Sequence, residues 1–222
     1  MENFQNIQFS VAPDLATKGI KVRAALFSVP NIPRGRGNGL ERHIKETINA
    51  LNIDELLESP IIAEYKRLQK KAGISEPVSP AEYLLKLIQK SGMLPGINRI
   101  VDCYNIVSAE TLLSMGAHDL RKIRGNHIQL RTTNGTERYT PLGETKPVKV
   151  APGEYGTFDD EIMLCRLDLR QCAETICDQA TRNFLVYAQG NAETSDAYVL
   201  EGIERVRDNI RDFCDGEWLI LD

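Results

Sequence analysis

The stretch INRIVDCYNIVS, residues 97–108, combines apolar residues at helical spacing with three short polar side chains. Asn98, Asp102 and Asn105 fall at positions i, i+4 and i+7, so a helix aligns them as one polar stripe. The apolar residues between them predict that the rest of the helix is mostly buried. The stripe is therefore either a capping network or the wall of a site.

Helix signals continue on both sides of this stretch. SPAEYLLKLIQKSG, residues 79–92, has Ser79 as a candidate N-cap, Pro80 at the first helical position, Glu82 in the place of a capping box, and Gly92 as a stop signal. Amphipathic spacing predicts further helices over 40–51, 61–72 and 197–213. These segments place helices before and after a region with a different pattern.

Strand patterns open the chain and dominate its later half. Strands are predicted at 7–11, 20–26, 147–150, 162–169, 182–188 and 217–222. The pair Asn134-Gly135 between two strand-like runs predicts a hairpin. Helices near both ends, with strands from both ends joined to a multi-stranded middle, predict the α+β fold class.

Length and composition bound the class of protein. A chain of 222 residues with 42% hydrophobic residues supplies a sizeable core, and we expect one domain over 1–222. It contains no run of ~18 apolar residues and no basic start followed by an apolar stretch, so a cytoplasmic location without membrane contact is expected. A net charge of −4 speaks against a non-specific nucleic-acid binder, and no DNA partner is predicted.

The charge is unevenly distributed along the chain. Residues 18–45 carry seven basic residues against one acidic residue, whereas 193–222 carry nine acidic against three basic. The loop RGRGNG, residues 34–39, precedes a helix and offers backbone N–H groups to a phosphate. The predicted RNA contacts are Lys21, Arg23, Arg34 and Arg36. The alternative is that two solvated faces differ by chance and that the loop is an ordinary surface loop.

Metal and nucleophile patterns are weak. The five cysteines form no CxxC pair, and His43, His118 and His127 are well separated, so no metal or cofactor is predicted and the thiols are expected to be reduced and structural. In LCRLDLRQC, residues 164–172, alternation places Arg166, Asp168 and Arg170 on one strand face. That face is either a solvated salt-bridge surface or, in a cleft, an anchor for an anion.

Several ordered motifs resemble a known domain. They are VDCYN (101–105), AHDL (117–120), IQLR (128–131), GEYGTFDD (153–160), CRLDLR (165–170) and Thr181. Together they resemble the B3/B4 domain of the phenylalanyl-tRNA synthetase β subunit, and more closely the stand-alone proteins built around that domain. The resemblance is strongest over residues 79–190.

The resemblance implies a three-layer arrangement with a β-sandwich-like core and flanking helices. In the synthetase this domain is the editing module, which removes a wrongly attached amino acid, chiefly tyrosine, from the tRNA. It therefore implies a free-standing hydrolase of mischarged aminoacyl-tRNA, active in translation quality control, with charged tRNA as partner. The alternatives are a non-catalytic module that binds RNA or an amino-acid-like ligand, and an interaction scaffold; the oligomeric state is left open.

The same resemblance assigns candidate site residues. Asn105 and Asp102 match the Asn and Asp of the family's VDxTN motif, so Asn105 is expected to contact substrate or water, and Asp102 to bind an ammonium group or brace the helix. The predicted substrate-binding residues are Asn98, His118, Arg166, Asp168, Thr181 and Tyr187. Gly116 stands where the family pattern has a His, and Tyr187 stands where it has an acidic residue. Specificity for tyrosine is therefore not implied.

Overall fold

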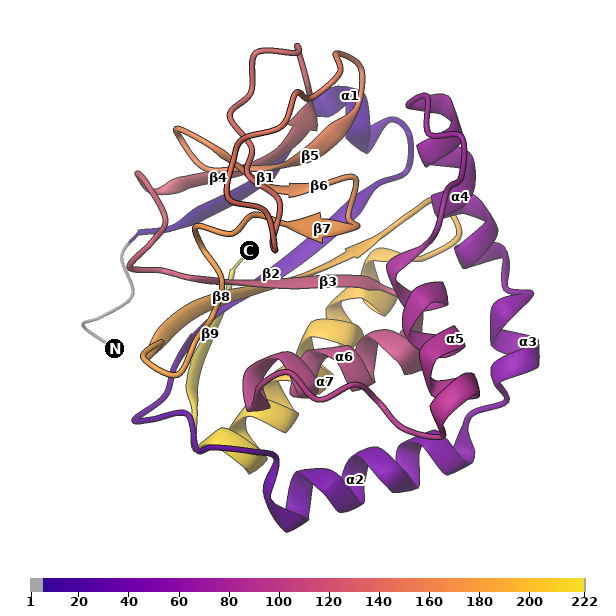
Figure 1. The fold of residues 1–222 in the computed structure, drawn as a ribbon, viewed down its shortest axis with the longest axis vertical. Helices are drawn as coiled ribbons and strands as arrows, with labels where there is room; N and C mark the ends of the chain where they lie inside the picture. Colours follow the sequence, from indigo (N-terminus) through magenta and orange to yellow (C-terminus); the bar gives the residue numbers. More distant parts are fainter. Residues whose placement is uncertain (1–5, 222) are drawn as a thin grey trace.

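Two β-sheets and a layer of helices build the fold of residues 6–221, the part of the chain that the computed structural model describes (Figure 1). The four-stranded sheet has the order β3 (Ser114–Asp119), β8 (Asn183–Gly190), β2 (Lys21–Ser28) and β9 (Glu217–Leu221). The five-stranded sheet has the order β1 (Gln8–Val11), β4 (His127–Thr132), β5 (Tyr155–Phe158), β6 (Met163–Arg166) and β7 (Arg170–Gln171). All strand pairs are antiparallel except β1 with β4.

The four-stranded sheet is the middle layer because its central strands are apolar on both faces. In β2, Ala25 and Phe27 belong to the core shared with the helices, whereas Ala24 and Leu26 belong to the core shared with the five-stranded sheet. Alternate residues of a strand point to opposite faces, so one apolar run serves two layers. The predicted α+β class and three-layer arrangement are confirmed.

The helices follow their local signals closely. They are α1 (Pro13–Ala16), α2 (Gly37–Ala50), α3 (Ile53–Leu57), α4 (Pro60–Lys71), α5 (Pro80–Ser91), α6 (Arg99–Thr111) and α7 (Asp196–Cys214). In α5 the Glu82 carboxylate accepts the Ser79 backbone N–H at 3.4 Å, and Gly92 ends the helix with a φ of 71°. Helices α6 and α7 pack against each other, and α7 also packs on β2 and β8 (Figure 1).

The predicted hairpin at Asn134-Gly135 and the predicted strand over 147–150 are wrong. Residues 133–154 connect β4 to β5 without forming a strand. Asn134 does form a turn, in which its side chain accepts the Thr136 N–H at 2.9 Å. No ladder position remains for a strand directly after this turn, because β1 and β5 already occupy the two edges of β4. Strand β3 lies outside the segments that the pattern identified as strands.

Membrane-spanning helices and metal-binding clusters are absent from residues 6–221. None of the helices in this part of the chain is both long and apolar enough to span a bilayer. No group of three or more His, Cys, Asp or Glu side chains in the same residues is arranged to hold a metal ion.

Candidate functional site

A groove of about 420 Å³ lies between helices α5 and α6 on one side and the β6–β7 hairpin on the other. Its walls are largely apolar, and several large apolar side chains at its rim are exposed, among them Tyr83, Ile97, Leu142 and Leu169. Its polar members are Tyr104, Asn105, Ser108, Asp168, Arg170 and Gln171. A groove with apolar walls and a few convergent polar groups is the usual form of a small-ligand site.

Helix α6 supplies one wall through residues at helical spacing. Val101, Tyr104, Asn105 and Ser108 line the groove, and they fall at i, i+3, i+4 and i+7. The half-buried Asn105 side chain makes no hydrogen bond within residues 6–221. The sequence analysis identified Asn105 but missed Tyr104 and Ser108, although their spacing from Val101 is the signal that would have found them.

The opposite wall ends in a strained turn. The predicted continuous strand through Arg166, Asp168 and Arg170 is wrong, because the chain reverses between β6 and β7 and the Leu169 N–H donates to the Arg166 carbonyl at 3.0 Å. Leu167 and Asp168 have φ values of 53° and 59°, in the left-handed region that non-glycine residues rarely adopt. The three charged side chains therefore do not share one face.

The neighbours of Asp168 in the turn have other partners. Arg166 donates two hydrogen bonds to the buried Glu154 carboxylate, at 2.5 and 2.6 Å. Arg170 donates to the Leu142 carbonyl at 3.0 and 2.6 Å and lines the groove. Arg166 thus forms a structural ion pair with Glu154, whereas the Arg170 side chain places a positive charge at the groove.

Asp168 is a buried carboxyl group at the groove. The residue is 6% exposed, its Oδ2 accepts a hydrogen bond from Gln189 Nε2 at 2.5 Å, and its Oδ1 is buried without a partner in the described chain. Burial raises the pKa of Asp168 to about 7, while the nearby Tyr155 and Gln189 side chains act in the opposite direction. The carboxyl group is therefore poised between its neutral and charged forms.

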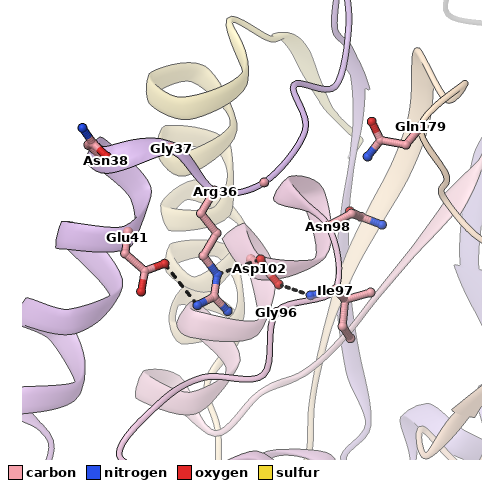
Figure 2. Close-up of a pocket in the computed structure, with 10 residues that line it drawn as sticks. Arg36, Gly37, Asn38, Glu41, Gly96, Ile97, Asn98, Asp102 and Gln179 are labelled. Carbon is pink, nitrogen blue, oxygen red and sulfur yellow. Dashed lines mark hydrogen bonds and ion pairs between the residues drawn. The ribbon is translucent and has the colours of Figure 1, made fainter.

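The polar stripe of α6 is divided between two hollows. Asn98 caps α6, since its Oδ1 accepts the Val101 N–H at 3.0 Å and its Nδ2 donates to the Cys177 carbonyl at 3.1 Å. Asp102 accepts Arg36 Nε at 2.9 Å and the Ile97 N–H at 3.0 Å (Figure 2). Both residues line a separate hollow of about 480 Å³ beside α2, whereas Asn105 lies in the groove.

Five of the six predicted substrate-binding residues lie outside the residues that line the groove: Asn98 and Arg166, described above, and His118, Thr181 and Tyr187. His118 is fully buried, its Nδ1 is 2.8 Å from Thr175 Oγ1, and burial lowers its pKa to about 3. Thr181 donates to the buried Asp119 at 2.7 Å. Tyr187 is 1% exposed and its ring lies against His118 in the core between the sheets. The contacts of Thr181 and Tyr187 are structural, whereas His118 Nε2 is buried without a hydrogen-bond partner in the described chain.

The predicted RNA-binding cations do not form one patch. Lys21 donates to the Gly19 and Asn191 carbonyls, both at 3.1 Å, and Arg23 pairs with Asp196 at 3.3 Å. Arg36 lies between Asp102 and Glu41 (Figure 2). It also donates to the Leu94 carbonyl at 2.7 Å. Arg34 is exposed on the loop before α2.

Cys165 also lines the groove, but its chemistry argues against a nucleophile. Burial raises the pKa of its thiol to about 12, so the thiolate is scarce near neutral pH. A covalent step through this cysteine is therefore disfavoured. The groove is equipped to bind and orient a ligand rather than to attack it with a side chain.

The fold is an α+β domain with an apolar groove at its surface, and comparison with known families identifies it further. The B3/4 domain model matches residues 68–202, so the chain belongs to the B3/4 domain family. Among solved structures it is similar to an N-terminal fragment of the phenylalanyl-tRNA synthetase β-subunit from Pyrococcus horikoshii, with a TM-score of 0.53 and 11% identity over 96% of this chain. The chain covers 50% of that structure's length. A search of curated protein sequences finds no match.

Proposed function

We propose that the protein hydrolyses the ester bond of mischarged aminoacyl-tRNA, with the amino acid held in the groove between α5, α6 and the β6–β7 hairpin. The observation that carries the proposal is Asn105, a half-buried amide on the wall of an apolar groove that makes no hydrogen bond within residues 6–221. An amide in that position is available to a ligand or a water. Membership of the B3/4 family supports a tRNA-related context.

The chemistry asks little of the protein beyond positioning. An aminoacyl ester is already labile, so a cavity that orients the ester and one water, together with donors for the developing oxyanion, is sufficient. Asn105 and Gln171 bring side-chain amides to the groove, and Arg170 brings a positive charge. In this proposal Asp102 acts as a brace for α6 rather than as a catalytic group, because Arg36 and the Ile97 N–H occupy its two oxygens.

A positive surface next to the groove suits the tRNA backbone. Helix α5, whose inner side lines the groove, borders a hollow of about 560 Å³ on its other side with α4. Four basic residues line this hollow against Glu58 and Glu82: Lys66, Arg67, Lys70 and Lys86. The lining carries a small net positive charge, since Lys66 and Lys86 pair with Glu82 and Arg67 pairs with Glu64. Phosphate contacts position a nucleic acid without reading its sequence, so we assign the tRNA approach to this face of α4 and α5.

The test is release of amino acid from a panel of correctly and incorrectly charged tRNAs, including phenylalanine tRNA carrying tyrosine. We expect Asn105→Ala to lower the release rate about a hundredfold, the order of effect of removing one oriented amide donor, with an unchanged melting temperature. Asn38→Ala, an exposed asparagine at the second hollow, is the matched control and is expected to keep full activity.

Two outcomes would contradict the proposal. Absence of release from every tRNA in the panel would favour a non-catalytic module that binds a small ligand, which the exposed apolar rim of the groove also accommodates. An Asn105→Ala protein with full activity and a lowered melting temperature would make Asn105 structural and place the chemistry elsewhere.

A further inference from the structure

Three buried polar groups around Asp168 lack a hydrogen-bond partner in the described chain. They are Asp168 Oδ1, Gln189 Oε1 and the Tyr155 hydroxyl. Gln189 donates to Asp168 through its other amide atom, and the Tyr155 hydroxyl faces the Asp168 carboxyl as a donor that lowers its pKa. Of the three residues Asp168 is the one that lines the groove, and because buried polar groups are nearly always paired, its unpaired oxygen there needs an explanation.

The three unpaired atoms are all oxygens that can accept a hydrogen bond. Asp168 Oδ1 and Gln189 Oε1 accept hydrogen bonds and cannot donate them when Asp168 is ionised, and the Tyr155 hydroxyl can accept as well. The charged residues that the pKa of Asp168 responds to include no Lys or Arg within the described chain. The donors at this site are the Gln189 amide N–H and the Tyr155 O–H, both directed at Asp168, and none of the groups that shift its pKa carries a positive charge.

The backbone of the turn that carries Asp168 is strained. Leu167 and Asp168 both adopt positive φ, and the turn is kept in this conformation because the Leu167 side chain is 2% exposed, in a cluster with Leu15 and Leu68. Strained backbone of this kind clusters at sites where a group must be presented to a ligand. The Ser114 hydroxyl, which donates to the Asp168 carbonyl at 3.4 Å, also ties the turn to β3.

We infer that the Asp168 carboxylate, oriented by Gln189 and Tyr155, receives a primary ammonium group at the groove, which in the proposed function is the α-ammonium of the aminoacyl moiety. A primary ammonium group brings N–H donors and one positive charge, which match the unpaired Asp168 Oδ1 and the charge of its carboxylate. A water molecule brings two donors and no charge. The inference rests on the proposed function for the identity of the ligand, but the receptor can be tested without tRNA.

The test uses pairs of non-hydrolysable amides that differ only in the amino group. One pair is L-tyrosinamide and 3-(4-hydroxyphenyl)propanamide, and the other is L-leucinamide and 4-methylpentanamide. Titration calorimetry at neutral pH on the wild-type protein is expected to show at least about tenfold tighter binding of each amine than of its deamino counterpart, since close charge pairs in binding sites couple by this much or more.

Variants separate the receptor from general charge effects. Asp168→Asn is expected to reduce the preference for the amine to within about twofold, because the carboxylate supplies the attraction. Asp212→Asn, which removes an exposed carboxylate on α7, is the matched control and is expected to keep the preference. The comparison within each wild-type pair does not depend on how the variants fold.

Equal binding of the two members of both pairs by the wild-type protein would overturn the inference, as would a preference that survives in Asp168→Asn. So would the absence of amine binding at millimolar concentration. The proposed function fails separately. Amine-selective binding without release from any charged tRNA leaves the receptor and removes the hydrolase, whereas Asn105-dependent release without amine selectivity does the reverse.

Discussion

Replacing Asp168 with Asn should make the protein more stable at alkaline pH and leave its stability little changed in acid. In the folded protein burial raises the pKa of this carboxyl from 3.8 to about 7. Below pH ~4 the carboxyl is protonated in both the folded and unfolded states, so its ionisation contributes nothing. Between pH ~4 and ~7 the unfolded state loses the proton and the folded state keeps it, so stability falls as the pH rises.

Above about pH 7 both states are ionised and the full cost of the buried charge is present. A shift of about three pKa units corresponds to about 4 kcal/mol at about 1.4 kcal/mol per unit, which is an upper bound because structural relaxation lowers it. The groups that face the carboxyl come from four elements and are neutral across this range: Tyr65, Tyr155, Cys165, Tyr187 and Gln189. Asp168 itself therefore accounts for the pH dependence.

The measurement is urea unfolding of wild-type protein and Asp168→Asn at about pH 4 and about pH 8, without ligand. The difference in unfolding free energy between the two proteins should grow by about 2–4 kcal/mol in favour of the variant between these pH values. Asp212→Asn, at an exposed ion pair, should show a change below about 1 kcal/mol. A pH-independent difference for Asp168→Asn would refute the assignment of a buried, poised carboxyl at the groove.

Two further substitutions test the parts of the fold that frame the groove. Arg36→Ala leaves the buried Asp102 carboxylate without its cation and should lower the unfolding free energy by about 3 kcal/mol, measured by urea denaturation; a loss below about 1 kcal/mol would show that the pair does not brace α6. Gly156→Ala should destabilise by about 1–3 kcal/mol, because a Cβ there clashes with the Cys165 carbonyl oxygen. Gly39→Ala in α2, whose Cβ meets only ordinary contacts, should raise the melting temperature slightly; a fall as large as that of Gly156→Ala would contradict the reasoning.

The sequence by itself determined the features that depend on near neighbours. The caps of α5, the amphipathic faces of α4 and α7, and the apolar alternation in β2 follow from spacing over a few residues, and the structure has them at the expected positions. The α+β class followed from the helix and strand patterns, and the three-layer arrangement followed from the family resemblance; the structure shows its basis, since β2 is apolar on both faces and requires a layer on each side. The family followed from ordered motifs along the chain, and the B3/4 match bears it out.

Only the tertiary structure decided which polar residues meet. Asn98, Asp102 and Asn105 form one stripe on an isolated helix, yet α2 packs against one end of α6 and the β6–β7 turn faces the other, so the stripe serves two hollows. The hairpin signal at Asn134 was overridden because β1, distant in sequence, pairs with β4. Asp168 became a buried receptor group because long-range packing of Leu167 stabilises a positive-φ turn that local preferences oppose. Contacts between distant segments carry these outcomes, and no local pattern encodes them.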